Sequence, residues 1–121
     1  MATSAIASRR KSILIVEDEA MIAMMLEEFV DTLGHHVHGI ATTVDQGCQM
    51  VADGGFDFAI LDCHLAGNEV WPVARMLEDR SIPYILSSGG SISEVPSDYA
   101  SRPMLSKPFT IAAIADLLQA I

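Results

Sequence analysis

"FAILDCHLAGNEV" (residues 58–70) opens with four apolar residues that run directly into a carboxylate, Asp62. A short, wholly apolar run is typical of a strand buried on both faces, as in a parallel sheet that helices cover on each side. Such a strand delivers a charged side chain to the edge of a buried sheet. The stretch therefore predicts a parallel α/β fold. It also raises the question of which group balances the charge of Asp62.

Apolar runs and amphipathic stretches alternate on both sides of this strand. We expect strands over residues 13–16, 36–40, 56–61, 83–87 and 103–105. Apolar residues at helical spacing predict helices over residues 21–33, 43–51, 70–77 and 111–121. Thr43 and Gln46 have the spacing of a capping box at the start of the second helix. Right-handed crossovers then favour a doubly wound five-stranded parallel sheet in the flavodoxin-like order 2-1-3-4-5.

The stretch "GGSISEVPSDYASR" (89–102) departs from this alternation. It carries two glycines, a central Pro96 and little periodicity, so we expect a short or irregular fourth helix there. At 121 residues the chain has the size of one domain with a single core. We expect residues 1–12 to form a flexible tail and residues 13–121 to form the domain.

Composition and charge exclude several classes of protein. A net charge of −9, from 16 acidic and 7 basic residues, argues against direct nucleic-acid binding, which needs a clustered basic face. Two cysteines are too few for a disulfide scaffold and suit a reduced cytosol. No secretory signal and no run of roughly 20 apolar residues is found, so we expect a soluble, cytoplasmic protein with no membrane contact.

Reactive side chains follow four of the predicted strands at their carboxyl ends. Ligands of open parallel sheets bind at this edge, where the strand order reverses. The side chains placed there are Glu17 and Asp18, Asp62, Ser87 and Ser88, and Lys107. Each has an ordinary explanation by itself: Asp18 as a helix cap, Asp62 as a turn cap, Ser88 in a loop, and Lys107 before a helix that starts with proline.

Together these residues are harder to explain structurally. Carboxylates about 4 Å apart repel each other by roughly 4 kcal/mol at an effective dielectric constant near 20. A cation should therefore lie among them. Mg²⁺ is the natural candidate, because it binds one or two carboxylates together with water and phosphate oxygens.

Four motifs then identify a family. "ILIVEDE", "FAILDCHLAG", "PYILSSG" and "SKPF" resemble, in order and spacing, the signature regions of response regulator receiver domains. The resemblance covers residues 13–121. It implies that Asp62 accepts a phosphoryl group and that Glu17 and Asp18 bind Mg²⁺, with Asp62 and the backbone carbonyl of His64 as further ligands.

The same resemblance implies a switch around the phosphoryl group. Ser88 matches the switch hydroxyl, Gly89 the small residue after it, and Lys107 the lysine that contacts the phosphoryl oxygens. Met104 stands where the family usually has an aromatic partner of the hydroxyl. His64 and Gly90 occupy positions that tune the rate of dephosphorylation.

The implied function is a phosphorelay receiver that catalyses only its own phosphorylation and dephosphorylation. Its partners would be a histidine kinase or histidine phosphotransfer protein and a downstream protein target, with a homodimer possible. A receiver-like interaction module that works without phosphorylation is the alternative. A phosphatase of the haloacid dehalogenase type is disfavoured, because His64 stands where such enzymes need a second aspartate.

Other residues have competing explanations. His36 and His38 would share one face of a strand, either as a transition-metal pair or as part of an exposed edge strand. Cys63 is expected to pack in the core. The methionines Met21, Met24 and Met25 are expected to fill the core rather than to form a binding stripe.

Overall fold

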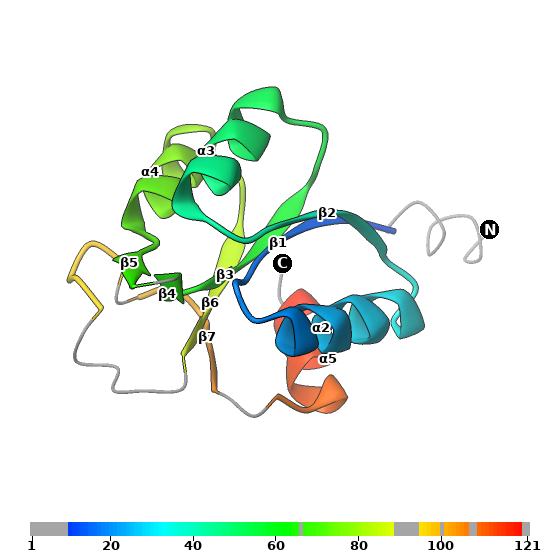
Figure 1. Cartoon of the computed structure of the whole chain (residues 1–121). Coiled ribbons are helices and arrows are strands. Elements are labelled where there is room, and N and C mark those ends of the chain that lie inside the picture. Colours follow the sequence, from blue (N-terminus) through cyan, green and yellow to red (C-terminus); the bar gives the residue numbers. More distant parts are fainter. Residues whose placement is uncertain (1–9, 66, 89–94, 100, 107–108, 120–121) are drawn as a thin grey trace.

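The structure is a computed structural model that describes residues 10–65, 67–88, 95–99, 101–106 and 109–119. Five parallel strands form its central sheet, in the order β2-β1-β3-β6-β7 (Figure 1). Their bounds are Ser12–Val16 (β1), His36–Ala41 (β2), Phe58–Asp62 (β3), Tyr84–Ser88 (β6) and Met104–Ser106 (β7). Counted along the chain without the small hairpin described below, this is the predicted order 2-1-3-4-5, so the flavodoxin-like fold is confirmed.

Among the described residues, four helices cover the sheet, two on each face. Helices α2 (Ala20–Thr32) and α5 (Ile111–Gln119) lie on one face, and α3 (Val44–Asp53) and α4 (Trp71–Asp79) lie on the other (Figure 1). All four are predicted from the sequence, with ends that differ by a few residues. No helix in the described part of the chain is both long and apolar enough to cross a membrane.

Alternation along the strands divides the core into two clusters. Every residue of β3 is buried, as the apolar run predicts. On the α2/α5 face the buried strand residues include Ile13, Ile15, Phe58, Ile60, Ile85 and Leu105. On the α3/α4 face they include Leu14, Val16, Ala59, Leu61, Tyr84 and Leu86. Successive residues thus serve opposite faces, and the same alternation continues to the ends of the strands.

A small hairpin after β3 is not predicted from the sequence. Strands β4 (His64–Leu65) and β5 (Asn68–Glu69) pair antiparallel, and Gly67 between them has a φ of +83°. Positive φ costs glycine little, which suits it to such a tight turn. Strands of two residues are too short for the periodicity of a sequence to reveal.

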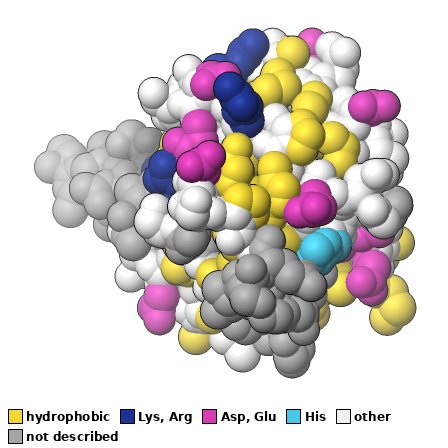
Figure 2. Space-filling model, turned by 90° about the vertical axis from the view of Figure 1, so that its left-hand side faces the viewer, with side chains coloured by type: hydrophobic (Ala, Val, Ile, Leu, Met, Phe, Trp, Pro, Cys, Tyr) yellow, Lys and Arg dark blue, Asp and Glu magenta, His cyan; other side chains and the backbone are white. Residues whose placement is uncertain are grey.

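The connection between β6 and β7 contains no helix in its described residues, 95–99 and 101–103, which form turns. Two contacts hold it against α4. The rings of Trp71 and Tyr99 stack with centroids 5.1 Å apart and planes 9° apart, and Arg102 forms a 2.5 Å ion pair with Glu78. Figure 2 shows the side of the molecule with α4 and this connection, where hydrophobic side chains form a band bordered by charged ones.

Tyr84 contacts both members of the Arg102–Glu78 ion pair. Its hydroxyl donates a 2.7 Å hydrogen bond to Glu78, and the Arg102 guanidinium lies 5.7 Å from the centre of its ring. Burial raises the pKa of Tyr84, and the bonded Glu78 carboxylate raises it further. The phenol therefore remains a proton donor at neutral pH.

The prediction that three methionines of α2 fill the core is wrong for two of them. Met21 and Met24 are 83% and 66% exposed, whereas Met25 packs against the core. The buried side of α2 is formed by Ala23, Leu26 and Val30. Which apolar side chains of a helix face inward depends on how the helix docks on the sheet, and residue type alone does not determine it.

His35 makes the start of the sheet sensitive to pH. Its Nδ1 accepts a 3.1 Å hydrogen bond from the backbone N–H of Lys11, next to β1. Burial lowers the pKa of His35 below 6.5, and the charges of Lys11 and Arg10 lower it further. The neutral His35 ring therefore makes its full contribution to the stability of the fold above pH 6.5. That contribution is lost as the pH falls through the lower pKa of the folded state.

We expect His35→Asn to weaken this dependence, because the Asn Oδ1 takes the place of Nδ1 and does not titrate in this range. Urea unfolding between pH 8 and pH 5 should show a smaller loss of unfolding free energy in the variant than in the wild type. His36→Asn, an exposed position one residue later, is the control. The prediction would be contradicted if the unfolding free energy of His35→Asn depended on pH as strongly as that of the wild type. A weaker pH dependence in His36→Asn alone would assign the effect to the wrong histidine.

Gly47 allows α3 to approach its neighbours closely. A Cβ at this position would lie 3.0 Å from a methyl group of Val73 on α4 and 3.5 Å from one of Val16 on β1. We expect Gly47→Val to lower the unfolding free energy by about 1–3 kcal/mol through overpacking. Combining it with Val73→Ala should recover part of the loss in urea unfolding; simple additivity of the two losses would show that the contact is not responsible.

Candidate functional site

Three carboxylates gather at the carboxyl end of the sheet. Glu17 and Asp18 directly follow β1, and Asp62 is the last residue of β3. One carboxylate oxygen from each lies within 4.8 Å of the others. Glu17 and Asp62 are only 1% and 5% exposed, and Asp18 is half-buried. The structure thus brings together three acidic residues that the sequence places at the ends of two different strands.

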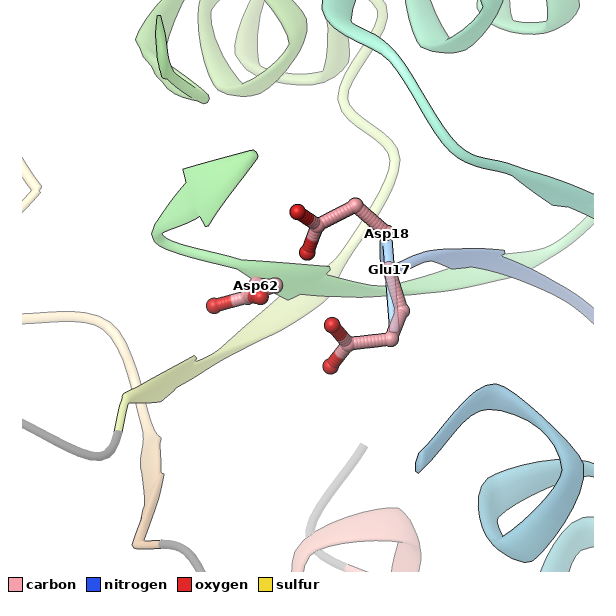
Figure 3. Close-up of side chains that lie close together, drawn as sticks. All are labelled: Glu17, Asp18 and Asp62. Atoms are coloured by element: carbon pink, nitrogen blue, oxygen red, sulfur yellow. The ribbon is translucent and has the colours of Figure 1, made fainter. Parts of the chain in front are cut away.

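The pairing of β1 with β3 explains why these carboxylates lie close together. Val16 pairs with Leu61, so the next residue of each strand, Glu17 and Asp62, lies at the same level. The backbone N–H of Glu17 also donates a 2.9 Å hydrogen bond to Ala41 at the end of β2. In Figure 3 the Glu17 and Asp18 side chains leave the chain in opposite directions, and their carboxylates flank that of Asp62.

The ordinary explanations for these residues hold only in part. The N-cap position of α2 is occupied by Glu19 rather than by Asp18, and the Glu19 side chain makes no capping hydrogen bond. The backbone N–H of Glu19 donates a 3.2 Å hydrogen bond to the Glu17 carboxylate. Asp62 does stabilise the turn after its strand, since its Oδ1 accepts a 3.3 Å hydrogen bond from the backbone N–H of His64. A single turn contact does not account for three clustered carboxylates.

The electrostatics of the cluster favour a bound cation. Carboxylate oxygens 4.8 Å apart repel each other by roughly 3 kcal/mol per pair at an effective dielectric constant near 20. A divalent ion with oxygen ligands removes this repulsion, and Mg²⁺ suits a site of few carboxylates that leaves positions for water and phosphate oxygens. The donor set and its spacing therefore fit Mg²⁺.

The remaining predicted site residues fall into two groups. Ser88 is the last residue of β6 and 7% exposed, and His64 lies exposed at the start of the hairpin. Met104 pairs with Leu86 and packs, partly buried, on the α3/α4 face of the sheet. Three predicted residues lie outside the described part of the chain: Gly89, Gly90 and Lys107.

Sequence reasoning missed the aromatic contact beside the site. Trp71 stacks on Tyr99, and its indole N–H donates a 2.5 Å hydrogen bond to Glu69 of the hairpin. This pair joins α4, the hairpin and the connection before β7. No periodic pattern reports a contact between residues so far apart in the chain.

The histidine pair does not form a metal centre with a third ligand in the described residues. His36 is exposed on β2, which is an edge strand, and the His38 ring lies 5.5 Å from that of Phe56. Glu17, Asp18 and Asp62 form the one group of three or more possible metal ligands found among the described residues. The edge-strand interpretation of His36 therefore accounts for the observed placement.

Comparisons with solved structures identify similar proteins. SdrG from Sphingomonas melonis Fr1 is 45% identical, with a TM-score of 0.84, and the match covers 93% of this chain and 96% of that one. The response regulator REC domain of PhyR from Erythrobacter litoralis is 26% identical, with a TM-score of 0.81, over 92% of this chain and 88% of that domain. No family model matches the chain.

A curated relative agrees with these structures. The phyllosphere-induced regulator PhyR of Methylorubrum extorquens is 31% identical over 115 residues, which is 88% of this chain. The match spans 41% of that regulator's length. The fold, the acidic cluster at the strand ends and the likeness to SdrG over nearly its whole length lead to one conclusion: the chain belongs to the response regulator receiver domains of two-component signalling.

Proposed function

We propose that this receiver domain accepts a phosphoryl group on Asp62 from a phosphohistidine donor and signals by a change of its surface. The observation that carries the proposal is the convergence of Glu17, Asp18 and Asp62, with oxygens within 4.8 Å, at the tip of a buried strand. A carboxylate at that place stands at the edge of the sheet, beside two further carboxylates that could hold a cation. The donor would be a histidine kinase or a histidine phosphotransfer protein.

Mg²⁺ would be held by Glu17, Asp18 and Asp62, with the backbone carbonyl of His64 as a further ligand. When bound, the ion neutralises negative charge on the phosphoryl oxygens. The hydrogen bond from the His64 N–H to Oδ1 orients the Asp62 carboxylate at the end of β3. Lys107 would supply a second positive charge, as the family resemblance implies.

The transfer is a substitution at phosphorus. An oxygen of the Asp62 carboxylate attacks, an O–P bond forms, and the P–N bond to the donor imidazole breaks. The electron pair of that bond remains on the imidazole nitrogen. The products are an aspartyl phosphate and an unphosphorylated donor histidine, and catalysis consists mainly of positioning and charge neutralisation.

A structure of the similar protein SdrG supports this chemistry. SdrG from Pseudomonas melonis Fr1 has been solved in a BeF₃-activated conformation, and that chain is 47% identical to this one with a TM-score of 0.79. Beryllium trifluoride on a carboxylate imitates an acyl phosphate in charge and shape. We propose the same kind of activation for this chain.

Phosphorylation would act on protein partners. It adds negative charge and strong acceptor oxygens at Asp62, toward which Ser88 and Lys107 would move, so that a second arrangement of the nearby loops becomes favoured. A double mutant of PhyR from Bartonella quintana, which is described as an anti-anti-sigma factor, is 26% identical, but the match spans only 54% of its length. For this chain we propose a protein target whose binding depends on phosphorylation.

Incubation with acetyl phosphate and Mg²⁺, followed by intact mass spectrometry, tests the proposal. We expect a gain of one phosphoryl group that hydroxylamine removes, as it does from acyl phosphates, and no gain when EDTA is present. No gain under any condition would support the interaction module that works without phosphorylation. Continuous release of inorganic phosphate without a modified chain would support a phosphatase instead.

A further inference from the structure

A row of three polar side chains crosses the sheet at its carboxyl end. Ile60 pairs with Ile15 on one side and with Ile85 on the other, and all three face α2 and α5. Two residues further along each strand, the same side carries Glu17, Asp62 and Ser87, because side chains alternate along a strand. Asp62 is paired directly with Ser87. The serine is thus the neighbour of the acceptor on the side away from Glu17.

The Ser87 hydroxyl is buried without a hydrogen bond. The residue is 0% exposed, and its Oγ has no partner among the described residues. Its neighbour in the row on β7 is Leu105, which is 3% exposed. A buried hydroxyl without a partner is unfavourable and uncommon, and apolar surroundings strengthen any hydrogen bond that it can form.

We infer that Ser87 is a positioning residue for the phosphorylated state, whose hydroxyl donates a hydrogen bond to the phosphoryl group on Asp62. The inference rests on the proposed function. Phosphorylation places strong acceptor oxygens on the paired residue of the next strand, where rotation of the hydroxyl can meet them. Because the bond forms only when the phosphoryl group is present, it favours the phosphorylated state over the unmodified one.

Ser87 and Ser88 then have separate roles. Alternation places Ser88 on the other side of β6, the side of Leu86 and the α3/α4 cluster. Ser88 matches the family's switch hydroxyl, whereas the role of Ser87 follows from its pairing with Asp62. The phosphoryl group would receive hydroxyl donors from both sides of the same strand.

Binding of BeF₃⁻ in the presence of Mg²⁺, followed by ¹⁹F NMR on the whole chain, tests this role at equilibrium. We expect Ser87→Ala to weaken binding about tenfold, the lower end for a hydrogen bond to a charged acceptor. Ser87→Thr, which keeps the hydroxyl, should restore most of the affinity. Unliganded Ser87→Ala should melt no lower than the wild type, because the alanine removes a buried polar atom without a partner.

The outcomes separate this inference from the proposed function. A wild-type chain that binds no BeF₃⁻ would refute both. Unchanged affinity in Ser87→Ala, with binding by the wild type, would refute the role of Ser87 and leave the function intact. Weaker binding accompanied by a lower melting temperature of unliganded Ser87→Ala would show a structural role instead. If Ser87→Thr is as stable as the wild type but binds BeF₃⁻ as weakly as Ser87→Ala, the proposed role of the Ser87 hydroxyl would also be refuted.

Discussion

We expect Asp62→Asn to abolish phosphorylation, so that the chain gains no mass after incubation with acetyl phosphate and Mg²⁺. An amide oxygen lacks the charge and the nucleophilicity of a carboxylate, so the substitution removes the reaction itself. The fold should survive, because asparagine keeps the Oδ1 that accepts the hydrogen bond from the His64 N–H. Removing one of three clustered carboxylates should also leave the protein at least as stable without Mg²⁺.

Asp57→Asn is the matched control for this experiment. Asp57 precedes β3 at the opposite end of the strand, where its carboxylate accepts a 2.8 Å hydrogen bond from the backbone N–H of Ser12. This variant loses the same charge at a distance from the acidic cluster and should be phosphorylated like the wild type. A hydroxylamine-sensitive mass gain in folded Asp62→Asn would show that another residue is the acceptor.

Asp18→Asn should have opposite effects on stability with and without Mg²⁺. Without the ion, loss of one repelling carboxylate is expected to raise the unfolding free energy by about 1 kcal/mol, since the half-buried Asp18 is partly screened by solvent. In the wild type, Mg²⁺ at ten times its dissociation constant adds about 1.4 kcal/mol. The variant should lose most of that gain and most of its phosphorylation rate.

Thermal unfolding with EDTA and with Mg²⁺ measures both effects. Asp116→Asn, an exposed position on α5, removes the same charge away from the cluster and serves as the control. It should leave the stabilisation by Mg²⁺ unchanged. An Asp18→Asn chain that Mg²⁺ stabilises as strongly as the wild type would place the ion elsewhere and remove the electrostatic basis of the proposed function.

Much of the fold follows from local patterns. The apolar run into Asp62 predicts a strand buried on both faces, and all of β3 is buried. The spacing of Thr43 and Gln46 predicts the start of α3, where the Thr43 hydroxyl accepts a 3.1 Å hydrogen bond from the Gln46 N–H. These features depend on neighbours a few residues apart, so the sequence reports them directly.

Features that depend on docking were not predictable in the same way. Met21 and Met24 are apolar residues of a helix that the sequence predicts, yet the docking of α2 leaves them in solvent. The stack of Trp71 on Tyr99 joins a helix to an irregular connection. Both results depend on how separate elements meet, and neither has a repeating signal in the sequence.

The sequence by itself determined which residues stand at the strand ends: Glu17, Asp18, Asp62, Ser87 and Ser88. The tertiary structure alone decided which of them are neighbours. Strand register depends on contacts across the whole sheet, and a shift of one residue would turn every side chain to the opposite face. Only the pairing of β3 with β1 and β6 places Asp62 between Glu17 and Ser87, and so provides a carboxylate cluster on one side of the acceptor and a buried hydroxyl on the other.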